Sequence, residues 1–151
     1  MFRDLRRMIS PLSKARAYCA RQERCQQEVR DKLYAWGSHK DEVESIISQL
    51  IGEGFLNEAR FAEHYAVSKS RQKGWGRKKI EYMLKAKGIS DQCITLGLKN
   101  IDREEQGSHL KKAIAKKLDQ LKETDPRMKR QKVIRYFLGK GFAIEEIEMY
   151  L

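Results

Sequence analysis

The stretch VRDKLYAWGSHKDEV, residues 29–43, sets the pattern from which the fold of this chain can be predicted. Two later stretches repeat it: IEYMLKAKGISDQCI at residues 80–94 and VIRYFLGKGFAIEEI at residues 133–147. Each has an apolar residue at its first, fifth and last positions and a glycine at its ninth position. Such a pattern is typical of a helix that ends at a glycine with positive φ, followed by a tight turn and another helix.

Apolar residues also recur at helical spacing before each of these stretches, and they predict one more helix per repeat. These helices would cover about residues 10–22, 58–72 and 108–122. No segment shows the sustained alternation of a strand, so we predict an all-α fold. It would consist of an N-terminal segment (residues 1–9) and three tandem three-helix repeats (residues 10–56, 57–106 and 107–151). Because repeats of this size are marginal alone, we expect them to stack into an elongated, curved solenoid.

The composition excludes several classes of protein. The 151 residues include 32 Lys and Arg against 21 Asp and Glu, a net charge of +11. No apolar run approaches the roughly 18 residues that cross a membrane, and the N-terminus lacks the apolar core of a signal peptide. The three cysteines have no metal-ligand spacing and suit a reducing compartment. We expect a cytoplasmic protein with no cofactor, no metal and no catalytic residues, since no nucleophile–base or paired-carboxylate arrangement occurs.

The charge follows the repeat. Residues 65–90 carry 8 basic and 1 acidic side chains, and residues 111–140 carry 11 and 3, whereas residues 37–64 and 141–151 are net acidic. In each repeat the first two helices are therefore basic and the third is acidic. A DNA-reading helix-turn-helix would place that acidic third helix against phosphate, so we expect the basic helices to meet an acidic or phosphate-rich surface instead. A merely solvated helix face is the alternative for any single lysine.

Two local motifs allow both a structural and a functional interpretation. With Gly76 as N-cap, Trp75 and Ile80 would form a hydrophobic staple, although Trp75 could instead stack on a nucleic-acid base. Cys25 stands three residues before Glu28, in the N-cap position of a capping box. Because a thiol accepts hydrogen bonds weakly, we expect this helix start to be less firmly held than one capped by serine.

A succession of further motifs completes the pattern. RQERCQQEV (residues 21–29) and GFLNEARFA (54–62) precede SKSRQKGWG (68–76), IEYMLKAKGIS (80–90) and FLGKGF (137–142). Their order and spacing resemble those of the bacterial regulatory protein RecX family over about residues 12–151. The chain departs from the family pattern at three positions: Cys25 replaces a serine, Glu58 replaces the commoner Asp, and Arg77 replaces a frequent proline.

The resemblance implies a non-enzymatic, cytoplasmic regulator of recombination that binds the RecA recombinase. Members of the family occupy the helical groove of the RecA–single-stranded DNA filament and restrain strand exchange, ATP hydrolysis and coprotease activity. We expect a monomer that reaches single-stranded DNA through the filament and does not contact a membrane. A general DNA- or RNA-binding helical module that acts without RecA is the alternative. The side chains expected to face RecA or DNA are Arg24, Arg30, Lys73, Trp75, Arg77, Lys78, Lys79, Lys85, Lys87, Lys129, Arg130, Lys132, Arg135 and Lys140.

Overall fold

The computed structural model describes residues 9–151, which contain helices and turns but no strand. In chain order the elements are α2 (Pro11–Arg21), α3 (Gln26–Ala35), α4 (Lys40–Gly52), α5 (Glu58–Ser68), the π-helical turn η1 (Lys69–Lys73), α6 (Arg77–Ala86), α7 (Asp91–Leu98), α8 (Arg103–Gln120), α9 (Pro126–Gly139) and α10 (Ile144–Glu148). The all-α prediction is confirmed. Of the predicted N-terminal segment, residues 1–8 lie outside the described part of the chain.

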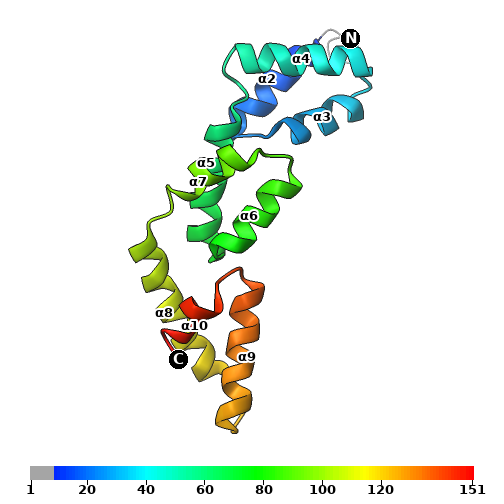
Figure 1. Cartoon of the computed structure of the whole chain (residues 1–151). Helices are drawn as coiled ribbons and strands as arrows, with labels where there is room; N and C mark the ends of the chain where they lie inside the picture. The colour runs from blue at the N-terminus through cyan, green and yellow to red at the C-terminus, as the bar shows by residue number, and fades with distance from the viewer. Residues whose placement is uncertain (1–8) are drawn as a thin grey trace.

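The helices form three successive groups, which we call the first unit (α2–α4), the second unit (α5–α7) and the third unit (α8–α10). The groups follow one another along an elongated, bent molecule, as predicted (Figure 1). The middle helices of the second and third units, α6 and α9, lie along the same side, on the right in Figure 1. None of the described helices combines the length and apolar character that a membrane crossing requires.

The three repeated glycines end the middle helices in the predicted way. Gly37, Gly88 and Gly141 have φ values of 93°, 80° and 99°. In each turn the residue after the glycine donates its backbone N–H to a carbonyl in the last turn of the helix: Ser38 to Leu33 (3.0 Å), Ile89 to Leu84 (3.1 Å) and Phe142 to Phe137 (3.1 Å). This is the Schellman motif, and it requires a left-handed residue that glycine adopts without strain.

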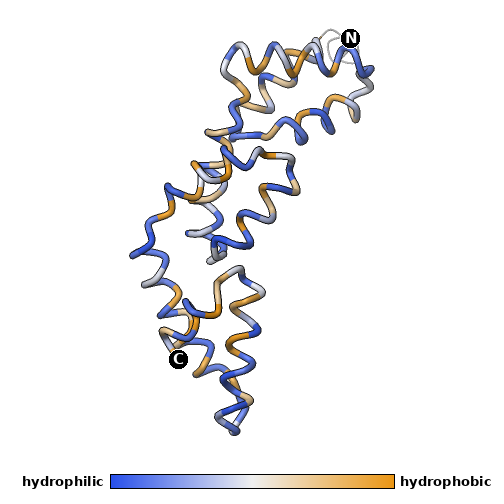
Figure 2. Tube along the Cα trace, viewed as in Figure 1, coloured by the Kyte–Doolittle hydropathy of each residue, from blue (hydrophilic) through white to orange (hydrophobic). Residues whose placement is uncertain are grey.

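The apolar positions of the repeat form the cores. All nine are buried: Val29, Leu33 and Val43 in the first unit, Ile80, Leu84 and Ile94 in the second, and Val133, Phe137 and Ile147 in the third. Figure 2 shows hydrophobic and hydrophilic residues interspersed along each helix, as expected of helices that bury one stripe. The first and second units share apolar packing, because Cys25 lies in the core of the second unit. The core of the third unit contains only its own residues.

Two helices differ from the sequence-based prediction. The first helix of the third unit begins at Arg103 rather than near residue 108, because the Asp102 carboxylate accepts hydrogen bonds from the backbone N–H groups of Glu104 (3.0 Å) and Glu105 (3.2 Å). The predicted boundary between residues 106 and 107 therefore falls within the first turn of α8. The helix expected over residues 58–72 changes to π-helical geometry at Lys69 and ends at Gly74, whose φ is 66°.

Candidate functional site

The start of α6 brings a tryptophan to the surface of the second unit. Gly76 is the N-cap of this helix, as predicted, and the half-buried Trp75 packs against the core cluster that contains Ile80. The ring of Tyr65, on α5, lies 6.4 Å from that of Trp75 between centroids. This packing favours the hydrophobic-staple interpretation of Trp75.

Lysine side chains lie over these two rings. The ammonium group of Lys69 is 5.3 Å from both ring centroids, and that of Lys79 is 4.6 Å from the Trp75 centroid. Lys87 lies 5.8 Å from the Tyr65 centroid. These are cation–π distances, so the rings hold the ammonium groups in place. A nucleic-acid base would have to compete with Lys69 and Lys79 for the ring of Trp75, which makes base stacking there unfavourable.

The same arrangement continues into the third unit. Lys117, on α8, and Lys140, at the end of α9, have their ammonium groups 4.1 and 5.7 Å from the ring centroid of Tyr136. The Lys140 ammonium also lies 3.5 Å from the backbone carbonyl oxygen of Lys73 in the second unit. We call this set the lysine–aromatic row; it comprises Tyr65, Lys69, Trp75, Lys79, Lys87, Lys117, Tyr136 and Lys140.

A backbone joint connects the two halves of the row. The Gly76 N–H donates to the carbonyl oxygen of Lys140 (2.8 Å), and the Lys78 N–H donates to that of Gly141 (3.1 Å). These two backbone segments approach so closely that a Cβ on Gly76 would overlap with the Gly141 carbonyl group and lie 2.6 Å from the Phe142 nitrogen. Only glycine fits at residue 76, and the hydrogen bonds donated by Gly76 and Lys78 fix where α9 lies relative to α6.

Polar side chains support this joint from α8. The buried Gln106 amide donates to the Trp75 carbonyl oxygen (3.2 Å) and lies 3.5 Å from the Ser70 hydroxyl oxygen. Nearby, the Arg71 guanidinium pairs with the Glu105 carboxylate at 2.9 Å. The second and third units are therefore held together chiefly by hydrogen bonds and charge rather than by a shared apolar core.

The first unit contributes a second group of cations and rings. The Arg24 guanidinium lies 3.8 Å from the Tyr18 ring centroid, and the rings of Tyr18 and Trp36 pack edge to face with centroids 6.4 Å apart. Between this group and the lysine–aromatic row stands Glu28, whose carboxylate is 3.7 Å from Arg24 and 3.8 Å from Lys87. Cations and aromatic rings thus extend across both junctions, and one carboxylate interrupts them at the first.

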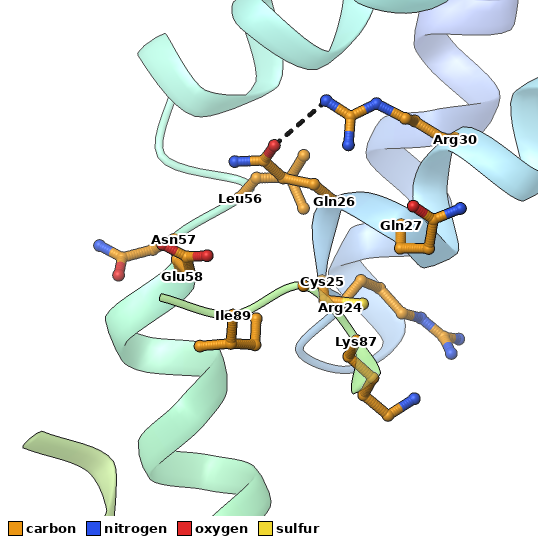
Figure 3. Close-up of a pocket in the computed structure, with 11 residues that line it drawn as sticks. Arg24, Cys25, Gln26, Gln27, Arg30, Leu56, Asn57, Glu58, Lys87 and Ile89 are labelled. Carbon is orange, nitrogen blue, oxygen red and sulfur yellow. Dashed lines mark hydrogen bonds between the residues drawn. The ribbon is translucent and has the colours of Figure 1, made fainter. Parts of the chain in front are cut away.

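A pocket lies at the junction of the first and second units (Figure 3). Arg24, Cys25 and Gln26 line it from the first unit, and Lys87 and Ile89 from the second. Among the described residues, no cluster of His, Cys, Asp or Glu side chains has the arrangement of a metal site. The pocket offers the cations of Arg24 and Lys87 and the Gln26 amide, together with the carboxylate of Glu58.

Cys25 is the N-cap of α3, and its side chain makes no capping hydrogen bond, as predicted. The side chain is 2% exposed, and its thiol donates to a Glu28 carboxylate oxygen at 3.2 Å. Burial raises the pKa of the Cys25 thiol to about 11. A thiol in this environment stays protonated near neutral pH, so it is a packing residue and not a nucleophile.

The structure brings some of the expected site residues together and separates others. Trp75, Lys79, Lys87 and Lys140 lie in the lysine–aromatic row, with Lys73 beside it. Arg77 does not, because its guanidinium donates to the Leu98 carbonyl oxygen (3.2 Å) at the end of α7. Four others pair with carboxylates of their own unit: Arg30 with Glu44 (2.8 Å), Lys85 with Glu81 (3.2 Å), Lys132 with Glu123 (3.1 Å) and Arg130 with Glu148 (3.8 Å).

The remaining expected residues are placed as follows. Lys78 and Arg135 are exposed, and Lys129 is half-buried on α9. Lys69, Lys117, Tyr65 and Tyr136 of the lysine–aromatic row were not among the residues expected from the sequence. The spacing of Tyr65 and Lys69, four residues apart on a helix, was a usable signal. The contact between Lys117 and Tyr136 joins two different helices and has no local signal.

Known protein families match this chain in all three of its units. Models of the first, second and third three-helix domains of RecX match residues 12–50, 57–98 and 104–151. The chain is 32% identical over 148 residues to the regulatory protein RecX of Pasteurella multocida, which covers 96% of this chain and 88% of that protein. It is 36% identical over 119 residues to the RecX of Clostridium perfringens strain 13, which covers 78% of this chain and 55% of that protein.

The fold is similar to a solved structure as well. The crystal structure of RecX from Lactobacillus salivarius superposes with a TM-score of 0.80 at 27% identity, covering 93% of this chain and 91% of that one. The clostridial relatives are longer, and the chain spans little more than half of their length. Sequence motifs, three domain matches and the similar fold agree, and the chain belongs to the RecX family.

Proposed function

We propose that this chain is a regulatory protein that binds the RecA–single-stranded DNA filament and restrains its recombinase, ATPase and coprotease activities. Its relatives are named regulatory proteins, and that supports the regulatory role. The observation that carries the proposal is the lysine–aromatic row, which crosses from the second to the third unit of an elongated molecule. Such a filament repeats along its length and contains the phosphates of the DNA strand, and a row of cations on an elongated protein is complementary to a repeating array of anions.

The repeat makes this complementarity cumulative. The middle helices of the second and third units, α6 and α9, are basic and lie on the same side, so contacts made by one raise the effective concentration of the other at the filament. The last helices, α4, α7 and α10, carry acidic side chains in their first turns, including Asp41, Asp91 and Glu145. Phosphate would repel these helix starts, so we place them away from the DNA, where they are free to meet basic groups on RecA.

The proposal is tested by following ATP hydrolysis by RecA on single-stranded DNA while the protein is added. We expect turnover to fall and to level off at saturation. The double substitution Lys79→Gln and Lys140→Gln, in the row, should weaken this effect. The control Lys85→Gln with Lys132→Gln removes the same charge from side chains that pair with carboxylates of their own unit, and it should retain the effect. Unchanged turnover at saturating wild-type protein would contradict the proposal.

A general nucleic-acid-binding module is the competing function. It requires tight binding to bare DNA or RNA at physiological salt, with a steep dependence on salt concentration. Binding that is weak for bare DNA and strong for the RecA filament, measured at the same salt concentration, favours the RecA regulator. Equal affinity for both favours the general module.

A further inference from the structure

Like charges gather where the second and third units meet. Lys69 and Lys79 lie over the ring of Trp75, Lys140 reaches across from the third unit to the carbonyl oxygen of Lys73, and Lys73 itself is exposed. The Lys69 and Lys79 ammonium groups share one ring, so they are within about 10 Å of each other, the Debye length at ~0.1 M salt. We call Lys69, Lys73, Lys79 and Lys140 the junction cluster. Within residues 9–151, none of these four lysines pairs with a carboxylate.

The joint that carries this cluster is weakly secured. The apolar cores of the second and third units are separate. The backbone hydrogen bonds of Gly76 and Lys78, the Gln106 amide and the ion pair of Arg71 hold the two units together. Hydrogen bonds of this kind contribute about 1 kcal/mol each, whereas repulsion between Lys140 of the third unit and the three lysines of the second unit opposes the closed arrangement. A bound polyanion would remove that repulsion.

The chemistry of the cluster suits a flexible chain of phosphates. All four cations are lysines, which bind oxyanions as point charges and require no bidentate geometry, so they can follow phosphates whose positions vary along a single strand. The aromatic ring between them already holds ammonium groups, so no base is read and contact is independent of DNA sequence. Successive phosphates of a flexible single strand are close enough to engage cations on both units at once.

We propose that the junction cluster binds consecutive phosphates of single-stranded DNA and that this contact holds the second and third units in their closed arrangement. The inference deepens the proposed function, since it names the DNA strand, rather than RecA, as the partner of this part of the row. The DNA thus acts as a clamp across a joint that the protein alone secures only with polar contacts.

The first test measures binding of a fluorescein-labelled oligo(dT) to the full chain by fluorescence anisotropy over a series of salt concentrations. The triple substitution Lys69→Gln, Lys79→Gln and Lys140→Gln should lower the slope of log affinity against log salt by about 2, or ~0.7 for each lysine. We expect affinity at low salt to fall at least tenfold. The matched control Lys85→Gln, Arg130→Gln and Lys132→Gln removes three charges that are ion-paired in the chain, and it should change affinity by less than about threefold. Equal losses in the two triple variants would overturn the site.

The second test measures closure in the wild-type protein by hydrogen exchange. The backbone N–H groups of Gly76 and Lys78 donate across the joint, so saturating oligo(dT) should slow their exchange. The N–H of Ser38, in the corresponding turn of the first unit, should be unaffected. Bound oligo(dT) with unchanged exchange at the joint would overturn the clamp. Neither test contains RecA, so failure here is distinguishable from failure to alter RecA turnover.

Discussion

The substitution Gly76→Ala places a methyl group where the second and third units touch. Its Cβ would overlap with the Gly141 carbonyl group and lie 2.6 Å from the Phe142 nitrogen. Backbone atoms cannot rotate away as a side chain can. Either the two backbone segments are therefore strained, or the joint opens. Overpacking of this kind costs about 1–3 kcal/mol. Opening loses two backbone hydrogen bonds, at about 0.5–1.5 kcal/mol each.

The cost of strain and the cost of opening are similar. Because the second and third units have separate cores, they can move apart, and we expect the joint to open. The free energy of unfolding should fall by roughly 1–3 kcal/mol, measured by urea denaturation followed by circular dichroism at 222 nm. Small-angle X-ray scattering should show a larger radius of gyration while the helix content is unchanged. Hydrogen exchange at Lys78 should become faster, because its N–H loses the Gly141 carbonyl.

Gly139→Ala is the matched control. Gly139 is the last residue of α9, its φ is not positive, and no atom lies within 4 Å of the added Cβ. Alanine there should be neutral or stabilise the protein by up to about 1 kcal/mol. A Gly76→Ala protein as stable and as compact as the wild type would refute the structural role assigned to the joint.

Four further predictions concern three single residues. Cys25 should resist iodoacetamide at pH 8 in the folded protein and react in the unfolded one, as read by mass spectrometry, because burial raises its pKa to about 11. Folding favours the neutral thiol, so its contribution to the free energy of unfolding should be lost as pH rises from about 9 to about 11. Paired urea titrations of the wild type and Cys25→Ala should show this loss in the wild type alone. Gln106→Ala leaves the Trp75 carbonyl without its donor and should cost about 1–3 kcal/mol in the same assay; a loss below 0.5 kcal/mol, as a rough bound, would show that water replaces the amide. Arg60→Gln removes the 2.6 Å pair with Glu23 and the hydrogen bond to the Gly54 carbonyl oxygen (2.9 Å); because the Glu23 side chain is only 25% exposed, the free energy of unfolding should fall by about 1–3 kcal/mol, and a loss below about 0.5 kcal/mol would contradict this role.

The helices and turns of each unit were predictable because their causes are local. A glycine followed by an amphipathic stretch requires positive φ and a buried stripe wherever it occurs, and Gly37, Gly88 and Gly141 met both conditions. The start of α8 was missed although Asp102 and Glu105 have capping-box spacing, because the turn between them is polar and offers no apolar periodicity. The π-helical turn at Lys69 has no clear sequence signal.

The candidate site was less predictable because its parts come from different units. Gly76 has a local role as an N-cap, but nothing near it indicates that the Gly141 turn lies against it. Likewise, the positions of Lys85 and Lys132 in basic helices do not reveal that each pairs with a nearby carboxylate. A sequence gives the charge of a helix, whereas only tertiary contacts decide which cations stay available to a partner.

An electron cryomicroscopy map of the protein bound along a RecA–single-stranded DNA filament would test the proposed docking most directly. The side that carries α6, α9 and the lysine–aromatic row should face the filament, with the Lys79 and Lys140 side chains directed toward the DNA strand. A map in which that side faces solvent, or in which no protein is seated on the filament at saturating concentration, would contradict it.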